Sequence, residues 1–435
     1  MLLLLWPLAA FGGRSAGAAF IFALTSLLLA VVLRATTLAG GQSRSLDRIV
    51  LIIGIGTVIP TIPLPAAVAN LLSPRAAIVR QELALTSSAT AWTPLSIDEA
   101  STLWASVVVV GTIAVFFAAR TIVRSGGLRQ TVRGISALGF LFSILALAQA
   151  ATAGRLIYWR FPTEYEGPLP FGPFVNRNHF ATWIIMAAPV CFGYFIARSS
   201  GRDESNDQLV SKRTRLAKMA DGRMVWLAGA GAMMLAALLA SMSRSGILAL
   251  TGAVGWFAVA HRRRSAVRRV GWIVAVVVLI VGFALARADI PALAERFSQA
   301  GTGVRDRVKI WRDTVPVVKD FWLVGTGAGT YRSAMLVYQR ADRNVQFNQG
   351  HNHYLQAAAE GGTVLVSLLA ALLTMLVQAT RRQLAVDSSG AYWIRAGAAC
   401  GLLAVALQSL WETGLVMPAN AALAAVLAAI AAYER

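Results

Sequence analysis

Four short polar segments of the chain place arginine, histidine and asparagine beside strongly apolar runs. Their polar residues, in chain order, are Asn176, Arg177, Asn178, His179, Arg244, Arg305, Arg307, Arg312, His351, Asn352, His353 and Glu360. Arginine binds phosphate oxygens through paired hydrogen bonds and keeps its proton. Histidine is the side chain whose ordinary pKa best suits proton transfer near neutral pH. The set suits the binding of an anionic diphosphate together with a proton transfer.

Other chemistries fit these segments less well. His351 and His353 are two residues apart, so they would not share a helix face, and no Cys or Asp pair accompanies them as zinc ligands. Carboxylates are few near the segments, which argues against a Mg²⁺ site. The negative charge that develops on the leaving group would then be stabilised by arginine. The acidic residues considered are Glu164, Glu166, Asp306, Asp313 and Glu360. The run GTGAGT (325–330) lacks the last glycine of GxGxxG and is interpreted as turns.

Each polar residue also has a simpler explanation. Arg177 or Arg244 alone could reach lipid headgroups from the end of an apolar helix. His179 could cap the following helix or bind a loop carbonyl. The functional interpretation depends on all four segments facing the same compartment.

The composition indicates the elements that must position these residues. Of the 435 residues, 57% are hydrophobic and only 14% are charged, whereas soluble domains carry about 25% charged residues. The mean hydropathy is +0.62. Cys191 and Cys400 both lie within apolar runs, so neither a disulfide nor zinc is indicated. We expect an all-α, polytopic integral membrane protein.

Apolar runs long enough to cross a bilayer need roughly 17–25 residues. The segment 1–12 is also apolar but short, and we interpret it as an abbreviated span, giving about twelve transmembrane helices. The other predicted spans are 16–34, 48–69, 102–122, 131–153, 179–197, 223–240, 245–260, 270–287, 353–379, 393–410 and 414–433.

Basic residues predict the orientation of these spans. The segments assigned to the cytoplasm hold 23 Lys and Arg residues, whereas the short loops on the other side hold 7. Positive charge marks cytoplasmic loops, so both termini are expected inside and the long segment 288–352 outside. The basic runs 198–223 and 261–269 are then topology anchors rather than nucleic-acid sites. Two outer helices are also expected, one at PRAAIVRQELAL (74–85), lying on the membrane surface, and one at VRDRVKIWRDTVPVVKD (304–320).

The four segments resemble the signature motifs of the O-antigen ligase and polymerase superfamily. The motifs are PFVNRNHFATWIIMAAP, SRSG, RVKIWRDTVPVVKDFWLVGTGAGTY and HNHYLQAAAEGG. The resemblance covers about 171–362, and the N-terminal third agrees mainly in hydropathy. It implies an inverting, metal-independent glycosyltransferase without a cofactor, similar in fold to the GT-C glycosyltransferases. The chain would form a single transmembrane domain (1–435) in a bacterial inner membrane, with its active site beneath a periplasmic loop at 288–352.

The resemblance also implies roles for individual residues. The arginines of the family correspond to Arg177, Arg244 and Arg307, and its loop histidine corresponds to His351. His353 falls at a variable position and receives no role. His351, Arg244 and Arg177 are expected to be catalytic. The residues expected to bind the diphosphate or glycan are Arg307, Arg305, Asn176, Asn178, His179 and Asn352.

Several functions remain open at this point. A ligase moves a glycan from undecaprenyl diphosphate to a lipid A–core sugar, whereas a polymerase uses a second lipid-linked repeat unit as acceptor. A protein O-glycosyltransferase is a further possibility. A secondary transporter is disfavoured, because transporters usually carry internal repeats and polar groups near the membrane midplane. The sequence favours ligase over polymerase by a narrow margin, with membrane lipids as surroundings and no nucleic-acid partner.

Overall fold

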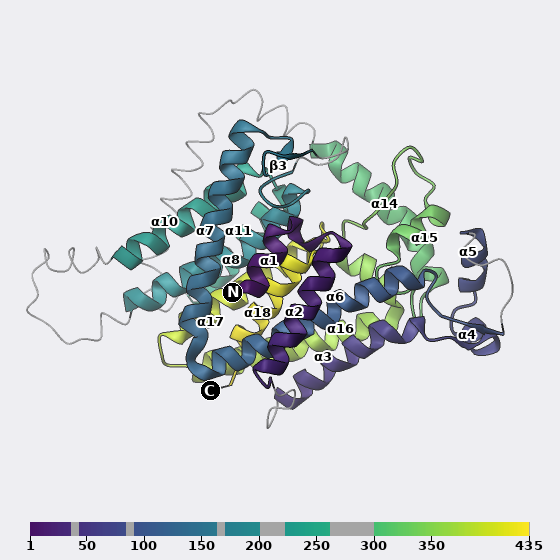
Figure 1. Cartoon of the computed structure of the whole chain (residues 1–435), viewed down its shortest axis with the longest axis horizontal. Helices are drawn as coiled ribbons and strands as arrows, with labels where there is room; N and C mark the ends of the chain where they lie inside the picture. Colours follow the sequence, from purple (N-terminus) through teal and green to yellow (C-terminus); the bar gives the residue numbers. More distant parts are fainter. Residues whose placement is uncertain (36–42, 84–90, 163–169, 201–221, 262–299, 435) are drawn as a thin grey trace, which may run out of the picture.

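The computed structural model describes residues 1–35, 43–83, 91–162, 170–200, 222–261 and 300–434. This part of the chain is almost entirely helical (Figure 1). Its strands form only short antiparallel pairs, β1 (Leu64–Pro65) with β2 (Trp92–Thr93) and β3 (Leu156–Ile157) with β4 (Phe161–Pro162). The expected all-α architecture is confirmed.

Five helical segments of the described residues are long and apolar enough to cross a membrane. They comprise α6 (Glu99–Ile122) with α7 (Leu128–Thr152), then α8 (Arg177–Ser200), α10 (Gly222–Ala240), α16 (His353–Val386) and α17 (Ala391–Gln408). Shorter apolar helices are α2 (Ala16–Val32), α11 (Arg244–Ala260) and α18 (Pro418–Ala432). The predicted span 270–287 lies outside the described residues, and α1 (Leu2–Ala9) is too short to cross alone.

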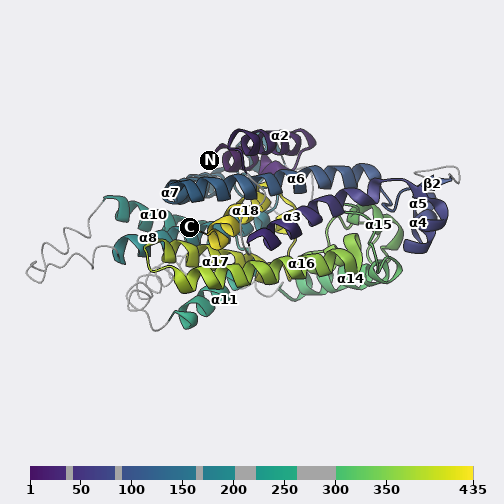
Figure 2. The same cartoon turned by 90° about the horizontal axis from the view of Figure 1, so that it is seen from below.

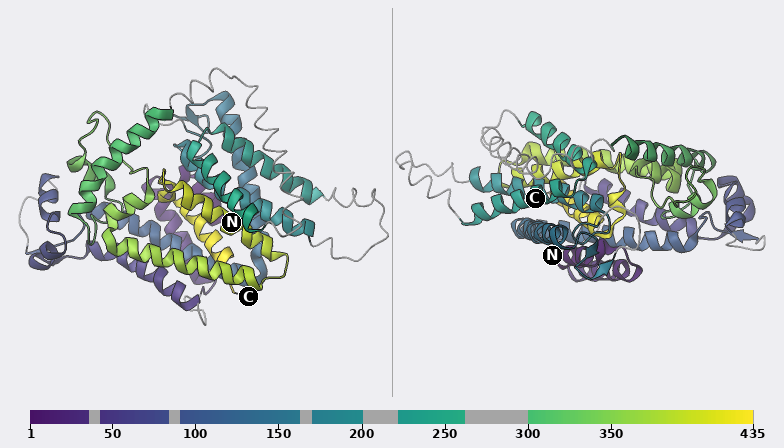
Figure 3. Two further views of the ribbon diagram at one scale, coloured as in Figure 1. Left: turned by 180° about the vertical axis from the view of Figure 1, so that it is seen from behind. Right: turned by 90° about the horizontal axis from the view of Figure 1, so that it is seen from above.

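The interior of the bundle is built from α8, α17 and α18, whose residues are mostly buried. Figure 3 shows α18 in the middle of the surrounding helices. The outer helices instead expose large apolar side chains, for example Leu28 and Val31 of α2 and Leu373 and Val377 of α16. Apolar exposure along whole helix faces is what a lipid-facing surface requires. The protein is therefore membrane-embedded.

The predicted span 48–69 differs from the structure. Helix α3 (Ser43–Val58) begins earlier and ends at Val58, followed by a 3₁₀ turn (Ile59–Thr61) and then β1. Pro60, Pro63 and Pro65 explain this end, because proline lacks the backbone N–H that a continuing helix needs. The chain after Pro65 forms α4 (Ala66–Leu72) and α5 (Ala76–Glu82) instead of completing a span.

One end of the bundle carries α14 (Ala300–Asp320), α15 (Tyr331–Tyr338), α4 and α5 (Figures 1 and 2). Both helices predicted for this region are present. However, α5 does not only lie along a surface, because its Ala76 and Val79 are buried in a cluster with Val317 of α14 and Met335 of α15. This outer cluster makes α5 part of the same unit as α14 and α15.

The other end is held by two buried ion pairs. Arg120 of α6 binds Asp47 of α3, and both side chains are almost fully buried. Arg395, near the start of α17, lies 3.7 Å from Asp387 and donates hydrogen bonds to backbone carbonyls at the end of α18. Leaving any of these charges without its partner would be costly, so the pairs fix where these helices meet.

The expected orientation can be tested with two exposed positions at opposite ends. Ser125 lies in the π-helical turn between α6 and α7, and Asn344 follows α15. In spheroplasts, an impermeant maleimide should label Asn344→Cys and should label Ser125→Cys only after permeabilisation. The native Cys191 and Cys400 are buried and give little background. The reverse labelling pattern would contradict the charge-based orientation.

Candidate functional site

A buried carboxylate, Glu412, lies where the polar segments meet. It follows α17, and only 1% of its side chain is exposed. Its Oε2 accepts hydrogen bonds from Asn178 Nδ2 at 2.7 Å and from Arg307 at 3.3 Å. Its Oε1 lies 3.0 Å from His351 Nδ1. One carboxylate therefore joins three of the predicted site residues from three separate segments.

The surroundings of Glu412 keep it ionised. Burial alone would raise its pKa, but the hydrogen bond with His351 and the electrostatic effect of His351, His179 and Arg307 outweigh burial and lower the pKa. A carboxylate that accepts hydrogen bonds from its neighbours is stabilised in its charged form. Glu412 is thus a fixed negative charge within a positive cluster.

The first turn of α8 is held from both sides. Asn176 precedes the helix, and its side-chain oxygen accepts a hydrogen bond from the Asn178 N–H at 2.8 Å, so it acts as a cap. His179 is buried, and its backbone carbonyl accepts a hydrogen bond from Asn420 of α18 at 3.1 Å. This arrangement points Asn178 at Glu412 and places His179 near that carboxylate.

The loop that carries His351 is fastened at several points. Gln349 accepts a hydrogen bond from Thr413, and the Gly350 N–H donates one to Gln356. Asn352 caps α16 by accepting a hydrogen bond from the Leu355 N–H at 3.0 Å. His351 has a φ of +45°, a left-handed backbone that a non-glycine residue adopts only where its surroundings enforce it. The loop therefore holds the imidazole in one place.

Helix α14 supplies two of these anchors from positions one turn apart. Arg307 binds Glu412, and Trp311 Nε1 donates a hydrogen bond to the Gly350 carbonyl at 2.9 Å. Residues at i and i+4 lie on the same face of a helix. The R-x-x-x-W motif thus gives α14 one face that contacts both Glu412 and the His351 loop.

The remaining predicted residues are placed as follows. Arg244 begins α11 and is exposed, and Arg177 begins α8 and is half-buried. These helix starts are close, since a Cβ on Gly246 would lie 2.9 Å from the Cβ of Ala181. Arg305 is exposed on α14, and the structure shows no bond between it and Glu412 among the described residues.

Two predicted site residues have structural roles. Asn176 and Asn352 both use their side chains as helix caps, and their predicted contact with substrate stays a prediction. The run at 325–330 also forms turns as expected, with positive φ at Gly325, Gly327 and Gly329. These turns wrap around Glu360, which accepts hydrogen bonds from the backbone N–H groups of Gly329 and Tyr331.

Glu412, the centre of the candidate site, was not among the residues predicted from the sequence. A sequence signal was present, because Glu412 is a charged residue in a short loop between two apolar spans on the same side as His351. Arg14 is also outside the predicted site residues, although its charge acts on His179. Trp311, which bonds the Gly350 carbonyl, is likewise outside the predicted site residues.

Comparison with known proteins supports the motif-based resemblance. A family model described as O-antigen ligase matches residues 229–370, a range that contains Arg244, Arg307 and His351. No curated protein matches the chain. The match over 229–370 supports the resemblance of the motifs to the O-antigen ligase and polymerase superfamily.

Proposed function

We propose that the protein is an inverting membrane glycosyltransferase that moves a glycan from a polyprenyl diphosphate to a sugar hydroxyl. The supporting observation is the buried Glu412, which joins His351, Arg307 and Asn178 at one end of the bundle. A histidine bonded to a carboxylate and surrounded by arginines can combine proton transfer with diphosphate binding.

In this proposal His351 is the general base. Its Nδ1–H donates to Glu412, which fixes the tautomer and leaves Nε2 to accept a proton. The acceptor hydroxyl oxygen attacks the anomeric carbon and its proton passes to Nε2. The bond between that carbon and the diphosphate oxygen breaks, its electron pair stays on the diphosphate, and the configuration inverts. Glu412 positions His351 and does not contact the substrate.

The arginines would bind the leaving group. Arg177 and Arg244 begin the neighbouring helices α8 and α11, and Arg307 lies beside Glu412. Fixed guanidinium groups stabilise charge that develops on a leaving diphosphate without having to reorient. Arg305, Asn178 and His179 would contact the diphosphate or the glycan around them.

The setting of the reaction completes the proposal. About twelve spans would form a single GT-C-like transmembrane domain (1–435) in a bacterial inner membrane, with both termini in the cytoplasm. The segment 288–352 would cover a periplasmic active site that uses an undecaprenyl-diphosphate donor. Catalysis would need neither a metal nor a cofactor, and activity should persist in EDTA.

We favour the ligase, with a lipid A–core sugar as acceptor, over a polymerase that extends lipid-linked repeat units. Deleting the gene and analysing the surface glycans separates the two functions. Accumulation of lipid-linked polymer is expected for a missing ligase, and single lipid-linked repeat units would instead identify a polymerase. Unchanged surface glycans and lipid-linked intermediates would contradict both.

The role of His351 can be tested by comparing it with His353. His351→Asn should lower transfer by at least about 100-fold, the contribution usual for a general base. Asparagine tolerates the left-handed backbone at this position, so the variant should fold and still bind donor. His353→Ala should have a milder effect on transfer measured in membranes of the deletion strain. An inactive His353→Ala beside an active His351→Asn would reverse the assignment.

Arg244 should require the planar guanidinium. Arg244→Lys is expected to lose more than about tenfold in transfer, equivalent to roughly 1.4 kcal/mol of transition-state stabilisation. Arg340→Lys is the matched control, because Arg340 is an exposed arginine of the outer region outside the motifs. Full activity of Arg244→Lys, with normal expression of both variants, would show that Arg244 only contacts lipid headgroups.

Glu412→Gln tests whether the carboxylate acts through His351. The variant should be strongly impaired, yet add little further loss in the His351→Asn background, because a positioning residue has no role once its histidine is gone. Equal, additive losses in both backgrounds would contradict this role. Glu82→Gln, at an exposed carboxylate of α5, should leave activity unchanged in either background.

The same residue should give a pH-dependent stability. Because the folded-state pKa of Glu412 is lowered, its ionised form stabilises the fold above the ordinary glutamate pKa of about 4.3. That contribution is lost as the pH falls through the lower folded-state value. The thermal unfolding midpoints of wild type and Glu412→Gln should therefore differ most at neutral pH and converge in acid. A difference that does not depend on pH would contradict the charge-based explanation.

A further inference from the structure

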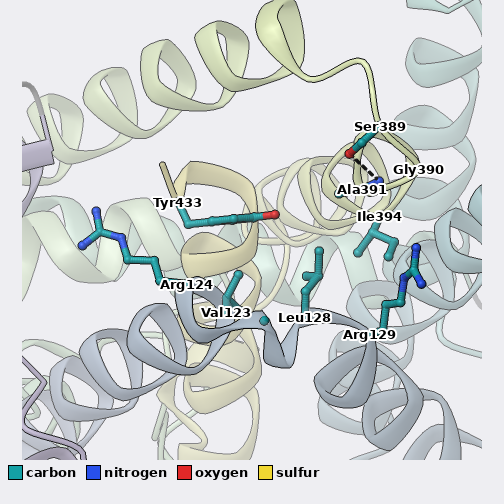
Figure 4. A pocket seen from close by; sticks show the side chains of 10 residues that line it. Val123, Arg124, Leu128, Arg129, Ser389, Gly390, Ala391, Ile394 and Tyr433 are labelled. Atoms are coloured by element: carbon teal, nitrogen blue, oxygen red, sulfur yellow. Dashed lines mark hydrogen bonds between the residues drawn. The ribbon is translucent and has the colours of Figure 1, made fainter. Parts of the chain in front are cut away.

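A second site candidate lies at the end of the bundle opposite Glu412. It is a cavity of about 500 Å³ between the turn that joins α6 to α7, the start of α17 and Tyr433 (Figure 4). Gln408, at the other end of α17, contacts the Asn178 carbonyl beside Glu412. At a rise of 1.5 Å per residue, α17 separates its two ends by roughly 25 Å. The cavity is therefore distinct from the proposed active site.

Two arginines give this cavity a positive rim. Arg124 and Arg129 flank the turn, in which Gly126 has a φ of +91° and reverses the backbone. Figure 4 shows them on either side of Val123 and Leu128. Both side chains are exposed, and the described residues show no hydrogen bond or salt bridge from either guanidinium.

The other charges near the cavity are largely paired within the protein. Asp47 binds Arg120, and Asp387 pairs with Arg395. Ser389 Oγ donates to Asp387, so this hydroxyl is also used. Glu434 is a nearby carboxylate whose charge acts on Arg124. The unpaired charge at the rim is therefore mainly that of Arg124 and Arg129.

The inner lining of the cavity is apolar. Val123, Leu128 and Ile394 contribute to it, and the buried ring of Tyr433 lies across it in Figure 4. A free inorganic anion gains nothing from such a surface. A phospholipid suits both parts, because its phosphate pairs with arginine and its glycerol and upper acyl chains contact apolar side chains.

We propose that this cavity binds the headgroup of an anionic phospholipid from the leaflet opposite the Glu412 site. Arg124 and Arg129 hold the phosphate, while Val123, Leu128 and Ile394 contact the glycerol region. Basic pockets between transmembrane helices at the cytoplasmic side are known as sites for such headgroups. The bound lipid links the α6–α7 turn to the start of α17. This proposal does not depend on the proposed transferase activity.

Native mass spectrometry of the purified full-length protein tests the site with dioleoyl phosphatidylglycerol as the probe. The double variant Arg124→Gln/Arg129→Gln should lower the apparent affinity at least tenfold. The matched control is Arg48→Gln/Arg133→Gln, which removes the same charge from exposed positions on α3 and α7 outside the cavity lining. This control should change the affinity less than twofold, and both proteins should elute as wild type in gel filtration.

Three results would overturn the proposal. Equal weakening by both double variants would mean that the lipid responds only to overall charge. Equal binding of dioleoyl phosphatidylcholine would mean that the anionic headgroup is not recognised. Arginine-dependent binding of inorganic phosphate without binding of phosphatidylglycerol would make the cavity an anion site and exclude the lipid as its ligand.

Discussion

The proposed active site depends on the burial of one carboxylate. An ionised group removed from water costs several kcal/mol unless its oxygens are fully hydrogen-bonded and its charge is balanced. Glu412 meets this condition only when Asn178, Arg307 and His351 all reach it. The cost of leaving it unsatisfied therefore forces α8, α14 and the loop before α16 to converge beside the end of α17.

This constraint explains why α5, α14 and α15 need not be held in place by a large core of their own. The buried cluster shared by α5, α14 and α15 is small compared with the main bundle. Ile97 and Ala359 extend this cluster to the bundle, and the rest of the attachment is polar and specific. Arg307 and Trp311 bind one face of α14 to the site, and Ser333 of α15 donates to Asp98, which caps α6. Such contacts position α14 and α15 through directional hydrogen bonds and an ion pair more than through buried apolar area.

Features of the fold that depend on neighbouring residues in the chain were predicted from the sequence. Apolar run length gave most helices, and the motif arginines and His351 were placed at one end of the bundle by the alternation of spans. The prediction for 48–69 was wrong because hydropathy alone was considered, although Pro60, Pro63 and Pro65 end the helix. Asn176 and Asn352 were expected to bind substrate; the structure adds that both cap helix starts, a role that uses the same residue type at the same place.

Glu412 could not be predicted from spacing, because its partners come from segments up to 234 residues away in the chain. Its place in a short loop between apolar spans was a signal in the sequence, but its partners become visible only when those segments are assembled. Local patterns identify which groups can do chemistry, whereas the balance of charge between them is a property of the folded structure.

Charge balance also explains why the proposed site needs more arginines than those that touch Glu412. A diphosphate diester carries a negative charge on each phosphate, and Glu412 already offsets the charge of Arg307. Additional cations must therefore come from residues outside the Glu412 cluster. Arg177 and Arg244 begin the adjacent helices α8 and α11, and Arg14 is close enough to act on His179. In the proposed mechanism Glu412 therefore orients the base, and Arg177 and Arg244 supply with Arg307 the positive charge that holds the diphosphate.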